Sequence, residues 1–555
     1  MPESSEPGLS GVCQKIDESG KETGRYRERS ESGKCDRKER IETTMSEAED
    51  KREYSKEKQE NPNNKNENRI HLEAGGSVKN LDALTVELPE DIARFKAMGH
   101  LKLANKVIDK RLQKEIPEAL RERLLLEREI LARLPQQYPH SWQSAINMMR
   151  ETFADFENEE LDDLLAEGAF EWICINGEIK LKDNFIDNLI KTRKDLMFRL
   201  LNEETIWDRR AQLNMLDDVM HQMKEKGSLR SKIHIRSTAS LRPFARREGT
   251  KIQVQLPLPI EYAQVKKFTY LGCSPECGKV APTSAVQRTI CFETEYQSGQ
   301  TFEVEYELEN EMKYWDWKEA SEKLDLSRKD GESKELNESN ELNKEREEAE
   351  KYLGEQFPHI RFTPYLRALA GEIVGDETNS VRKAKKIYDY ITTHVMYSYV
   401  RSYFTIEQQA TFTATNLKGD CGLQALLFIT LCRIVGVPAR WQSGLYACPK
   451  NIGCHDWAQF YIESYGWLYA DASFGGAAWR AGDLERWEFY FGNLDPYRIP
   501  TTSEYQSDFY FPKKYLRQDP YDNQMGEAEY EDQGLLEGTD FDTKHEKVEI
   551  ALIDK

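Results

Sequence analysis

Hydrophobic positions follow two different periods along this chain, and the change between them predicts a multidomain α+β protein. Over residues 79–230 apolar residues recur at spacings of three, four and seven, as in Ile116, Leu120, Leu124, Leu131 and Leu134. Such a stripe predicts amphipathic helices, and we expect further helices through segments such as ELDDLLAEGAFEWICI. This helical region should pack its own core and gather no catalytic residue types.

The period changes to two over residues 231–317. Segments such as KIHIRSTASL, TKIQVQLPLPI and TFEVEYELENEMKYW alternate apolar and polar residues between Gly, Pro and Ser, which predicts a small antiparallel β domain, either a sandwich or a barrel. A zinc site at Cys273 and Cys277 would need two more ligands, and only Cys291 lies near in sequence. We therefore favour free thiols in a loop over a metal site.

Three stretches are mostly charged and polar. Residues 1–78 mix both charge signs and cannot bury enough apolar surface to offset the entropy of ordering, which predicts a disordered tail. A single charged helix is the alternative. Residues 318–350 are expected to be a charged linker, and 516–555 an acidic C-terminal tail whose last residues, KVEIALI, could add an edge strand.

The composition narrows the classes of function. Among 555 residues, 78 Lys and Arg face 98 Asp and Glu, a net charge of −20, which argues against nucleic-acid partners. The sequence contains no run of about 18 apolar residues, so we expect no membrane span. The first residues lack the apolar core of a signal peptide. We therefore expect a cytoplasmic protein whose ten cysteines are thiols available for catalysis or metal binding.

One of these cysteines lies where a reactive thiol is expected. The segment GDCGLQALLFITLCRIVGVPAR, residues 419–440, predicts a buried helix that Asp420 caps and that ends near Gly436. Cys421 falls in the first turn, where unpaired amides favour a thiolate and should lower the thiol pKa. Cys432, in the apolar middle of the same helix, is more simply a core residue.

A cysteine nucleophile needs a base, and the segment 351–515 offers three histidines. His394 ends a predicted helix, where a structural role is sufficient to explain it. His359 lies in FPHIRF, well before the segment that contains Cys421. His455 begins a predicted strand, HDWAQFYIES, and the next strand ends at Asp471 in GWLYADASFGG. Antiparallel pairing can bring His455 and Asp471 together, provided that a bulge or a wide turn corrects their register.

The order of these pieces resembles the transglutaminase-like superfamily, and most of all its bacterial members. The matching residues are GDC at the start of a buried helix, GVPAR after it, HDWAQFYIESYGW and DASFGG. The resemblance implies a papain-like α+β core over 351–515, with Cys421 as nucleophile, His455 as base and Asp471 orienting the imidazole. Asp456 departs from the pattern, because the family has a small residue after the histidine, and it is the alternative acid to Asp471. Strand alternation should turn Asp456 away from His455.

The resemblance also implies a chemistry. The thiolate would attack an amide of a protein or peptide and form a thioester, which an amine or water then resolves. The Cys421 amide and a hydroxyl of Tyr397 or Tyr399 are candidate oxyanion donors. We expect neither a metal nor another cofactor, since no Asp-rich loop with calcium-binding spacing is present. The alternative is a transglutaminase-like scaffold or protein-binding module without turnover.

Overall fold

The computed structural model describes residues 78–329, 340–463 and 465–553. These ranges belong to one compact unit, which runs from Ile70 to Lys555. The expected N-terminal tail lies outside the described residues, apart from Val78, and so do residues 330–339 of the expected linker. The rest of that linker carries two helices, α10 (Trp317–Lys329) and α11 (Asn340–Glu350).

The helical region forms as its apolar stripe predicts. Leu124 and Leu131 pack with Ile92 and Ile108 in a small core of their own. The α-helices of this region are α2 (Glu90–Ala97), α3 (Leu101–Leu112), α4 (Glu118–Arg133), α5 (Trp142–Thr152), α6 (Glu159–Ala166), α7 (Phe185–Thr192), α8 (Lys194–Met197) and α9 (Glu203–Lys226).

One segment of this region was predicted wrongly as a helix. The chain leaves α6 at Ala166, and its residues Trp172–Ile175 form β2, which pairs with β3 (Glu178–Leu181) in a hairpin. The short strand β1 (His140–Ser141) completes this small sheet. Asn176 and Gly177 both have positive φ, 52° and 83°, which the two-residue turn of a tight hairpin requires. The Asn-Gly pair therefore decides the local structure against the helical period around it.

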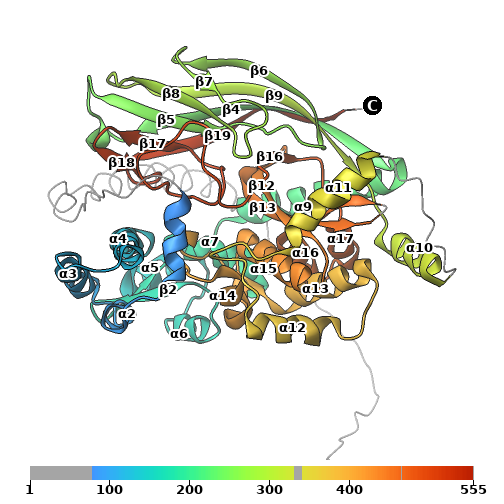
Figure 1. The fold of residues 1–555 in the computed structure, drawn as a ribbon, viewed down its shortest axis with the longest axis horizontal. Coiled ribbons are helices and arrows are strands. Elements are labelled where there is room, and N and C mark those ends of the chain that lie inside the picture. The colour runs from blue at the N-terminus through green and yellow to red at the C-terminus, as the bar shows by residue number, and fades with distance from the viewer. Residues whose placement is uncertain (1–77, 330–339, 464, 554–555) are drawn as a thin grey trace, which may run out of the picture. The chain divides into compact units, whose positions relative to one another are not determined.

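The β domain is a sandwich of two antiparallel sheets (Figure 1), ordered β19-β4-β9-β6 and β18-β17-β5-β8-β7. Alternate residues of β4 are buried, and the rings of Phe292 and Phe302 meet between the sheets with centroids 5.5 Å apart. The strands from the predicted region are β4 (Ser228–Leu241), β5 (Lys251–Pro257), β6 (Val265–Ser274), β7 (Lys279–Val280), β8 (Thr289–Glu295) and β9 (Thr301–Lys313).

The C-terminal segment belongs to this sandwich and is no tail. Strands β17 (Glu527–Tyr530), β18 (Gln533–Leu535) and β19 (Phe541–Ile553) lie, dark red in Figure 1, among the green strands of the domain. The edge strand β19 runs along β4 from Phe541 opposite Leu241 to Ile553 opposite Arg230. Its acidic residues face water and paired cations, as Glu549 does beside Lys232. Acidic composition therefore hid the strands, although the edge strand expected at KVEIALI is confirmed.

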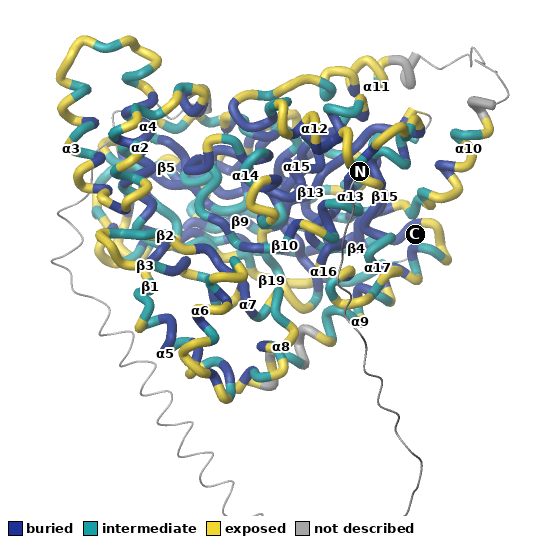
Figure 2. Tube along the Cα trace, turned by 90° about the horizontal axis from the view of Figure 1, so that it is seen from below, coloured by how far each residue is buried: buried dark blue, intermediate teal, exposed yellow. Residues whose placement is uncertain are grey.

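The remaining segment builds a mixed core around one sheet, ordered β15-β14-β13-β12-β16. Helix α15 (Cys421–Ile434) packs on β12 and β13, and it is buried along nearly its whole length (Figure 2). The sheet strands are β12 (Ala439–Ala447), β13 (Ile452–Ile462), β14 (Gly466–Ala470), β15 (Phe491–Gly492) and β16 (Arg498–Thr502), and two short parallel strands, β10 (Met396–Tyr397) and β11 (Lys418–Gly419), lie apart from them. The other helices are α12 (Pro364–Val374), α13 (Ser380–His394), α14 (Gln409–Asn416), α16 (Ala472–Ala481) and α17 (Leu484–Phe489).

The described ranges hold neither a membrane-spanning helix nor a cluster of metal-ligating side chains. None of their helices is long and apolar enough to cross a membrane. Within the same ranges, no group of three or more His, Cys, Asp or Glu side chains is arranged to hold a metal ion. Cys273 is a free thiol that donates a hydrogen bond to the Pro275 carbonyl, 3.3 Å away, and Cys277 is an exposed free thiol.

Candidate active site

Cys421 lies at the first position of α15, as the sequence predicts. Asp420 caps this helix by accepting a hydrogen bond from the Leu423 amide at 3.2 Å, and the Tyr403 hydroxyl donates to the same oxygen at 2.5 Å. The cysteine is partly exposed to a cavity of about 1160 Å³. A thiol at a capped helix start, open to a large cavity, is placed to meet a substrate.

Three parts of the chain line this cavity. The core contributes Cys421, His455 and Asp456. The helical region contributes residues such as Lys182 and Gln212, and the loop between β16 and β17 contributes others, such as Gln524. The helical region is therefore a wall of the cavity as well as a packed scaffold, which the sequence did not predict.

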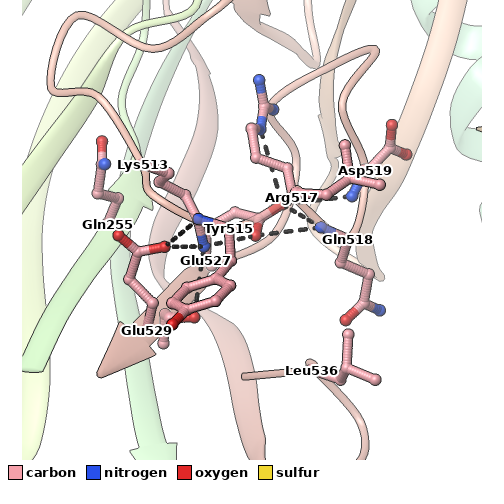
Figure 3. Close-up of polar contacts among 12 residues, drawn as sticks. Gln255, Lys513, Tyr515, Arg517, Gln518, Asp519, Glu527, Glu529 and Leu536 are labelled. Atoms are coloured by element: carbon pink, nitrogen blue, oxygen red, sulfur yellow. Dashed lines mark hydrogen bonds and ion pairs between the residues drawn. The ribbon is translucent and has the colours of Figure 1, made fainter. Parts of the chain in front are cut away.

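The loop between β16 and β17 is fixed by buried carboxylates of β17 (Figure 3). Glu527 accepts hydrogen bonds from the main-chain amides of Gln518 and Asp519, at 2.9 and 3.2 Å, and pairs with Lys513 at 3.1 Å. Burial by itself would raise the pKa of Glu527, but the charges of Lys513 and Arg517 outweigh it and hold that pKa below its usual value. The sandwich thus holds a wall of the cavity in place.

His455 and Asp471 are brought together, with Nε2 and Oδ2 2.8 Å apart. Strands β13 and β14 pair in regular register from Ile462 opposite Gly466 to Ala458 opposite Ala470, so no bulge, one of the two corrections expected from the sequence, shifts the register of this pair. Instead the chain leaves the sheet after Ala470, and Asp471 becomes the cap of α16 by accepting from the Phe474 amide at 2.9 Å. From there its carboxylate reaches diagonally to His455 on the same face.

A buried arginine completes this pair. Arg498 donates to the same Oδ2 of Asp471 at 2.8 Å and to Asp495 at 2.7 Å, and both Arg498 and Asp471 have no exposed surface. Burial by itself would raise the pKa of the Asp471 carboxyl, but the charges of His455 and Arg498 outweigh it and hold that pKa below its usual value. Asp471 is therefore ionised and fixed in position on both sides.

The imidazole of His455 is suited to take up a proton. Burial lowers its pKa, and the nearby charge of Asp471 offsets this only in part, so the ring is neutral at neutral pH. Because Nε2 is engaged with Asp471, Nδ1 is the nitrogen left for a proton from the thiol. The Phe474 ring, with its centroid 4.7 Å from that of the imidazole, helps to fix the orientation of His455.

The hydrogen bond of the Cys421 thiol goes to Asp456, with Sγ and Oδ2 3.3 Å apart. Asp456, which strand alternation was expected to turn away from His455, therefore contacts the thiol. Burial raises the pKa of Cys421, and the carboxylates of Asp456 and Asp420 raise it further. The expectation that the helix start would lower this pKa was wrong, because burial beside two carboxylates outweighs the helix dipole. In this arrangement the resting cysteine is a neutral thiol.

Of the two tyrosines proposed as oxyanion donors, Tyr397 is the one whose main chain pairs with the segment just before Cys421. It pairs with Gly419, two residues before Cys421, in the short β10–β11 ladder. The Tyr399 hydroxyl instead contacts the ammonium of Lys191, and its main-chain amide donates to Asn188 at 2.9 Å. Tyr397 therefore remains the better candidate for a donor to the reacting carbonyl.

The other cysteines and histidines of the core have simpler explanations. Cys432 is fully buried in the hydrophobic core, as predicted. His394 stacks on Tyr390 at the end of α13, with ring centroids 4.8 Å apart. His359 is buried and bonds the Tyr521 hydroxyl at 2.6 Å.

Sequence reasoning missed the groups that come from beyond Asp471. Arg498 and Asp495 lie in the stretch FYFGNLDPYRIP, which carries no recognisable catalytic pattern. Gln524, whose side chain donates to Asp456 at 2.5 Å and to the His455 carbonyl at 3.0 Å, lies in the segment expected to be a tail. An Asp and an Arg three residues apart beside aromatic residues are the one signal that could have indicated a buried ion pair.

A comparison with known protein families identifies the class of one part of the chain. Residues 367–472 match the family model of the transglutaminase-like superfamily, so this part of the chain, from α12 to the start of α16, is a transglutaminase-like domain. The match includes Cys421, His455 and Asp471. A transglutaminase-like domain supports, in general terms, a cysteine-dependent activity on peptides or proteins.

The solved structures that resemble the chain are distant. One is a protein named as a candidate cysteine protease from Cytophaga hutchinsonii, with 15% identity and a TM-score of 0.35 over 58% of this chain and 91% of that one. Another is the periplasmic domain of TgpA from Pseudomonas aeruginosa, with 11% identity and a TM-score of 0.24 over 48% of this chain and 95% of that one. The comparison with curated proteins gave no match.

Proposed function

We propose that this protein is a cysteine-dependent acyl transferase or hydrolase that acts on amide groups of proteins or peptides. The observation that carries the proposal is the buried array of His455, Asp471 and Arg498, in which His455 lines the same cavity as Cys421. A neutral imidazole oriented by an ionised carboxylate, in one cavity with a thiol at a helix start, supplies the groups needed for nucleophilic catalysis.

In the first step Cys421 gives its proton to Nδ1 of His455 as Sγ attacks the carbonyl carbon. The charge that develops on the carbonyl oxygen would be stabilised by the Cys421 amide and the Tyr397 hydroxyl. The C–N bond then breaks, His455 returns the proton to the leaving nitrogen, and ammonia or an amine departs from a thioester. Asp471 positions the imidazole and stabilises its cationic form.

The second step decides the class of enzyme. If an amine attacks the thioester, a new amide forms and the protein is a transglutaminase; if water attacks, a carboxylate forms and the protein is an amidase or protease. In both cases His455 takes the proton of the attacking group. The cavity of about 1160 Å³ is large enough for a segment of peptide on either side of the reacting bond.

One observation favours a second candidate, a binding module that keeps the fold without turnover. The thiol donates its hydrogen bond to Asp456, and its raised pKa keeps the sulfur in its less nucleophilic form. Such a module would still use the large cavity to hold a peptide or protein segment, without covalent chemistry.

The test is to trap the acyl group on Cys421. The protein is mixed with small glutamine peptides and amide or ester donors, and the cysteine peptides are analysed by mass spectrometry with and without an added amine. We expect a thioester on Cys421 alone and no thioester in Cys421→Ala. Cys454→Ala is the matched control, because Cys454 is an exposed thiol that lines the same cavity. If no donor acylates either cysteine, the binding module is the function that remains.

A further inference from the structure

A chain of contacts connects the Cys421 thiol to the β sandwich through a residue outside the proposed triad. The thiol donates to Oδ2 of Asp456 at 3.3 Å, and Oδ1 of Asp456 accepts from the Gln524 side chain at 2.5 Å. The Gln524 carbonyl in turn bonds Nε2 of His545 in β19 at 2.9 Å. Asp456 is only 4% exposed, so its orientation is fixed on both of its oxygens.

The residue after the cysteine makes this approach possible. Gly422 lies against Asp456 Oδ2 and the Tyr403 hydroxyl, and a Cβ at position 422 would collide with both. The carboxyl therefore lies against the first turn of α15, within hydrogen-bond distance of the sulfur. This close packing holds the thiol next to Asp456.

Further carboxyls surround Asp456 on the neighbouring elements. Asp420 faces it from the start of α15, and Asp519 and Asp522 face it from the loop between β16 and β17. Burial raises the pKa of Asp456 to about 7, with Asp420 and Asp519 adding to the rise, while its hydrogen bonds with Asp522 and Cys421 act in the opposite sense. Asp456 therefore changes its charge near neutral pH.

The remaining titratable groups nearby do not change their charge in that range. Burial holds the pKa of the phenols of Tyr397 and Tyr403 well above their usual values, so these groups stay neutral. Arg517 stays positive beside Asp519 and Asp522. Among the described groups around the thiol, the carboxyls thus dominate the response to pH, because His455 is held neutral by burial.

We propose that Asp456 is a positioning residue that, when ionised, holds Cys421 as a resting thiol and, when protonated, releases it to His455. The proposal rests on the proposed function. An ionised Asp456 accepts the thiol hydrogen bond and would place a second negative charge beside any thiolate. Once Asp456 takes up a proton from solvent, that repulsion ends, and its hydroxyl can donate to the sulfur. The thiol proton then passes to Nδ1 of His455, which forms a thiolate and an imidazolium with no change in total charge.

The experiment measures the ionisation of Cys421 directly. The rate of alkylation by iodoacetamide is followed on the Cys421 peptide by mass spectrometry between pH 5 and 10, in the full-length chain, with thermal unfolding as a check of the fold. The variants are Asp456→Asn, which keeps an oxygen for Gln524 and offers an amide donor to the sulfur, and Asp456→Ala, which offers neither. Asp187→Asn is the matched control, because Asp187 is an exposed aspartate of the same cavity.

We expect Asp456→Asn to react about tenfold faster than the wild type or more at pH 7.5, which corresponds to a fall of one unit or more in the pKa of Cys421. Asp456→Ala should show a smaller increase, and Asp187→Asn none. An unchanged or slower rate in Asp456→Asn would overturn the proposal. If that variant does not fold, the sign of the change in Asp456→Ala decides.

A second measurement separates this proposal from the proposed function. Where acylation of Cys421 is detected, its rate in the wild type should fall as the pH rises above about 7, and Asp456→Asn should lose this fall. A fall that persists in Asp456→Asn contradicts the proposal. If no donor acylates any variant, the proposed function fails, whereas the alkylation profile still shows whether Asp456 controls the thiol.

Discussion

At the scale of single residues, the site contains two buried aspartates whose surroundings shift their pKa values in opposite directions. Asp471 shares its charge with His455 and Arg498, and its pKa is held below the usual value. Asp456 has no cation in its hydrogen bonds, and its pKa is raised to about 7. The same residue type thus supports the imidazole at one position and restrains the thiol at the other.

Substitution of Asp471 should reduce acylation according to what remains to accept from His455. Asp471→Asn keeps an oxygen that can accept the ring N–H and should retain part of the rate. Asp471→Ala leaves His455 and Arg498 without this partner and should lose more, on the order of 10³–10⁴-fold. The acylation rate of Cys421 and the thermal unfolding of both variants are measured together. Equal rates in Asp471→Ala and the wild type would remove Asp471 from the mechanism.

Asp456 should also make stability depend on pH. Its folded pKa of about 7 lies above the ordinary value of 3.8, so the folded state binds the proton more tightly. The stabilisation is complete below about pH 4 and is lost as the pH rises through 7. Asp456→Asn removes this dependence, and its free energy of unfolding should fall less between pH 4 and 8, by on the order of 2–4 kcal/mol. Urea unfolding at both pH values tests this, and parallel losses in the variant and the wild type would contradict it.

At the scale of elements, the position of a side chain depends on where an element ends. Asp471 reaches His455 because β14 stops at Ala470 and the chain turns into α16. Cys421 meets the cavity because Asp420 and Tyr403 fix the first turn of α15. The loop between β16 and β17 forms a wall because the carboxylates of β17 bind its main-chain amides.

Substitution of Glu527 should loosen that wall. Glu527→Gln removes the charge that pairs with the buried Lys513 and Arg517 and should cost about 3 kcal/mol, because a buried cation loses its partner. Hydrogen exchange of residues 513–519 should rise, and the KM for a peptide donor should rise more than kcat falls. Glu531→Gln is the control, since the Glu531 side chain is 73% exposed. Unchanged exchange in Glu527→Gln would show that the loop is held by other contacts.

At the scale of the whole molecule, the segments before and after the core meet in one sandwich. Strands β17 and β19 pair with β5 and β4, which precede the core in sequence. The core is therefore inserted between strands of the β domain, and residues after 516 contribute to the cavity through Gln518, Asp522 and Gln524. Folding of the sandwich and assembly of the site are thereby coupled.

Deletion of residues 527–555 should abolish both the folding of the sandwich and the assembly of the site. It removes the partners of β4 and β5, exposes long unpaired strand edges that promote aggregation, and takes away Glu527 and His545. We expect loss of most soluble protein and no alkylation selectivity for Cys421 in what remains. A chain that ends at Ile553 serves as the control and should behave as the full-length protein. A stable, selectively reactive product of the larger deletion would show that the core folds without β17–β19.

The sequence by itself determined what depends on local pattern. The period of two gave the strands β4 to β6, β8 and β9, the apolar run with its Asp420 cap gave α15, and the order of Cys421, His455 and Asp471 indicated the transglutaminase-like class. Each of these features is read from short segments of the sequence and their order, so no contact with a distant partner is needed to recognise it.

The tertiary structure alone decided what depends on partners far along the chain. Arg498 and Gln524 reach the site from 27 and 69 residues beyond the groups they bond, Asp471 and the His455 carbonyl. The acidic C-terminal segment became strands because β4 and β5 offered it hydrogen bonds, and Asp456 met the thiol because α15 packs against β13. The direction in which the pKa of Cys421 shifts was also decided by the tertiary structure. Burial beside Asp456 and Asp420 raises this pKa and outweighs the local effect of the helix start.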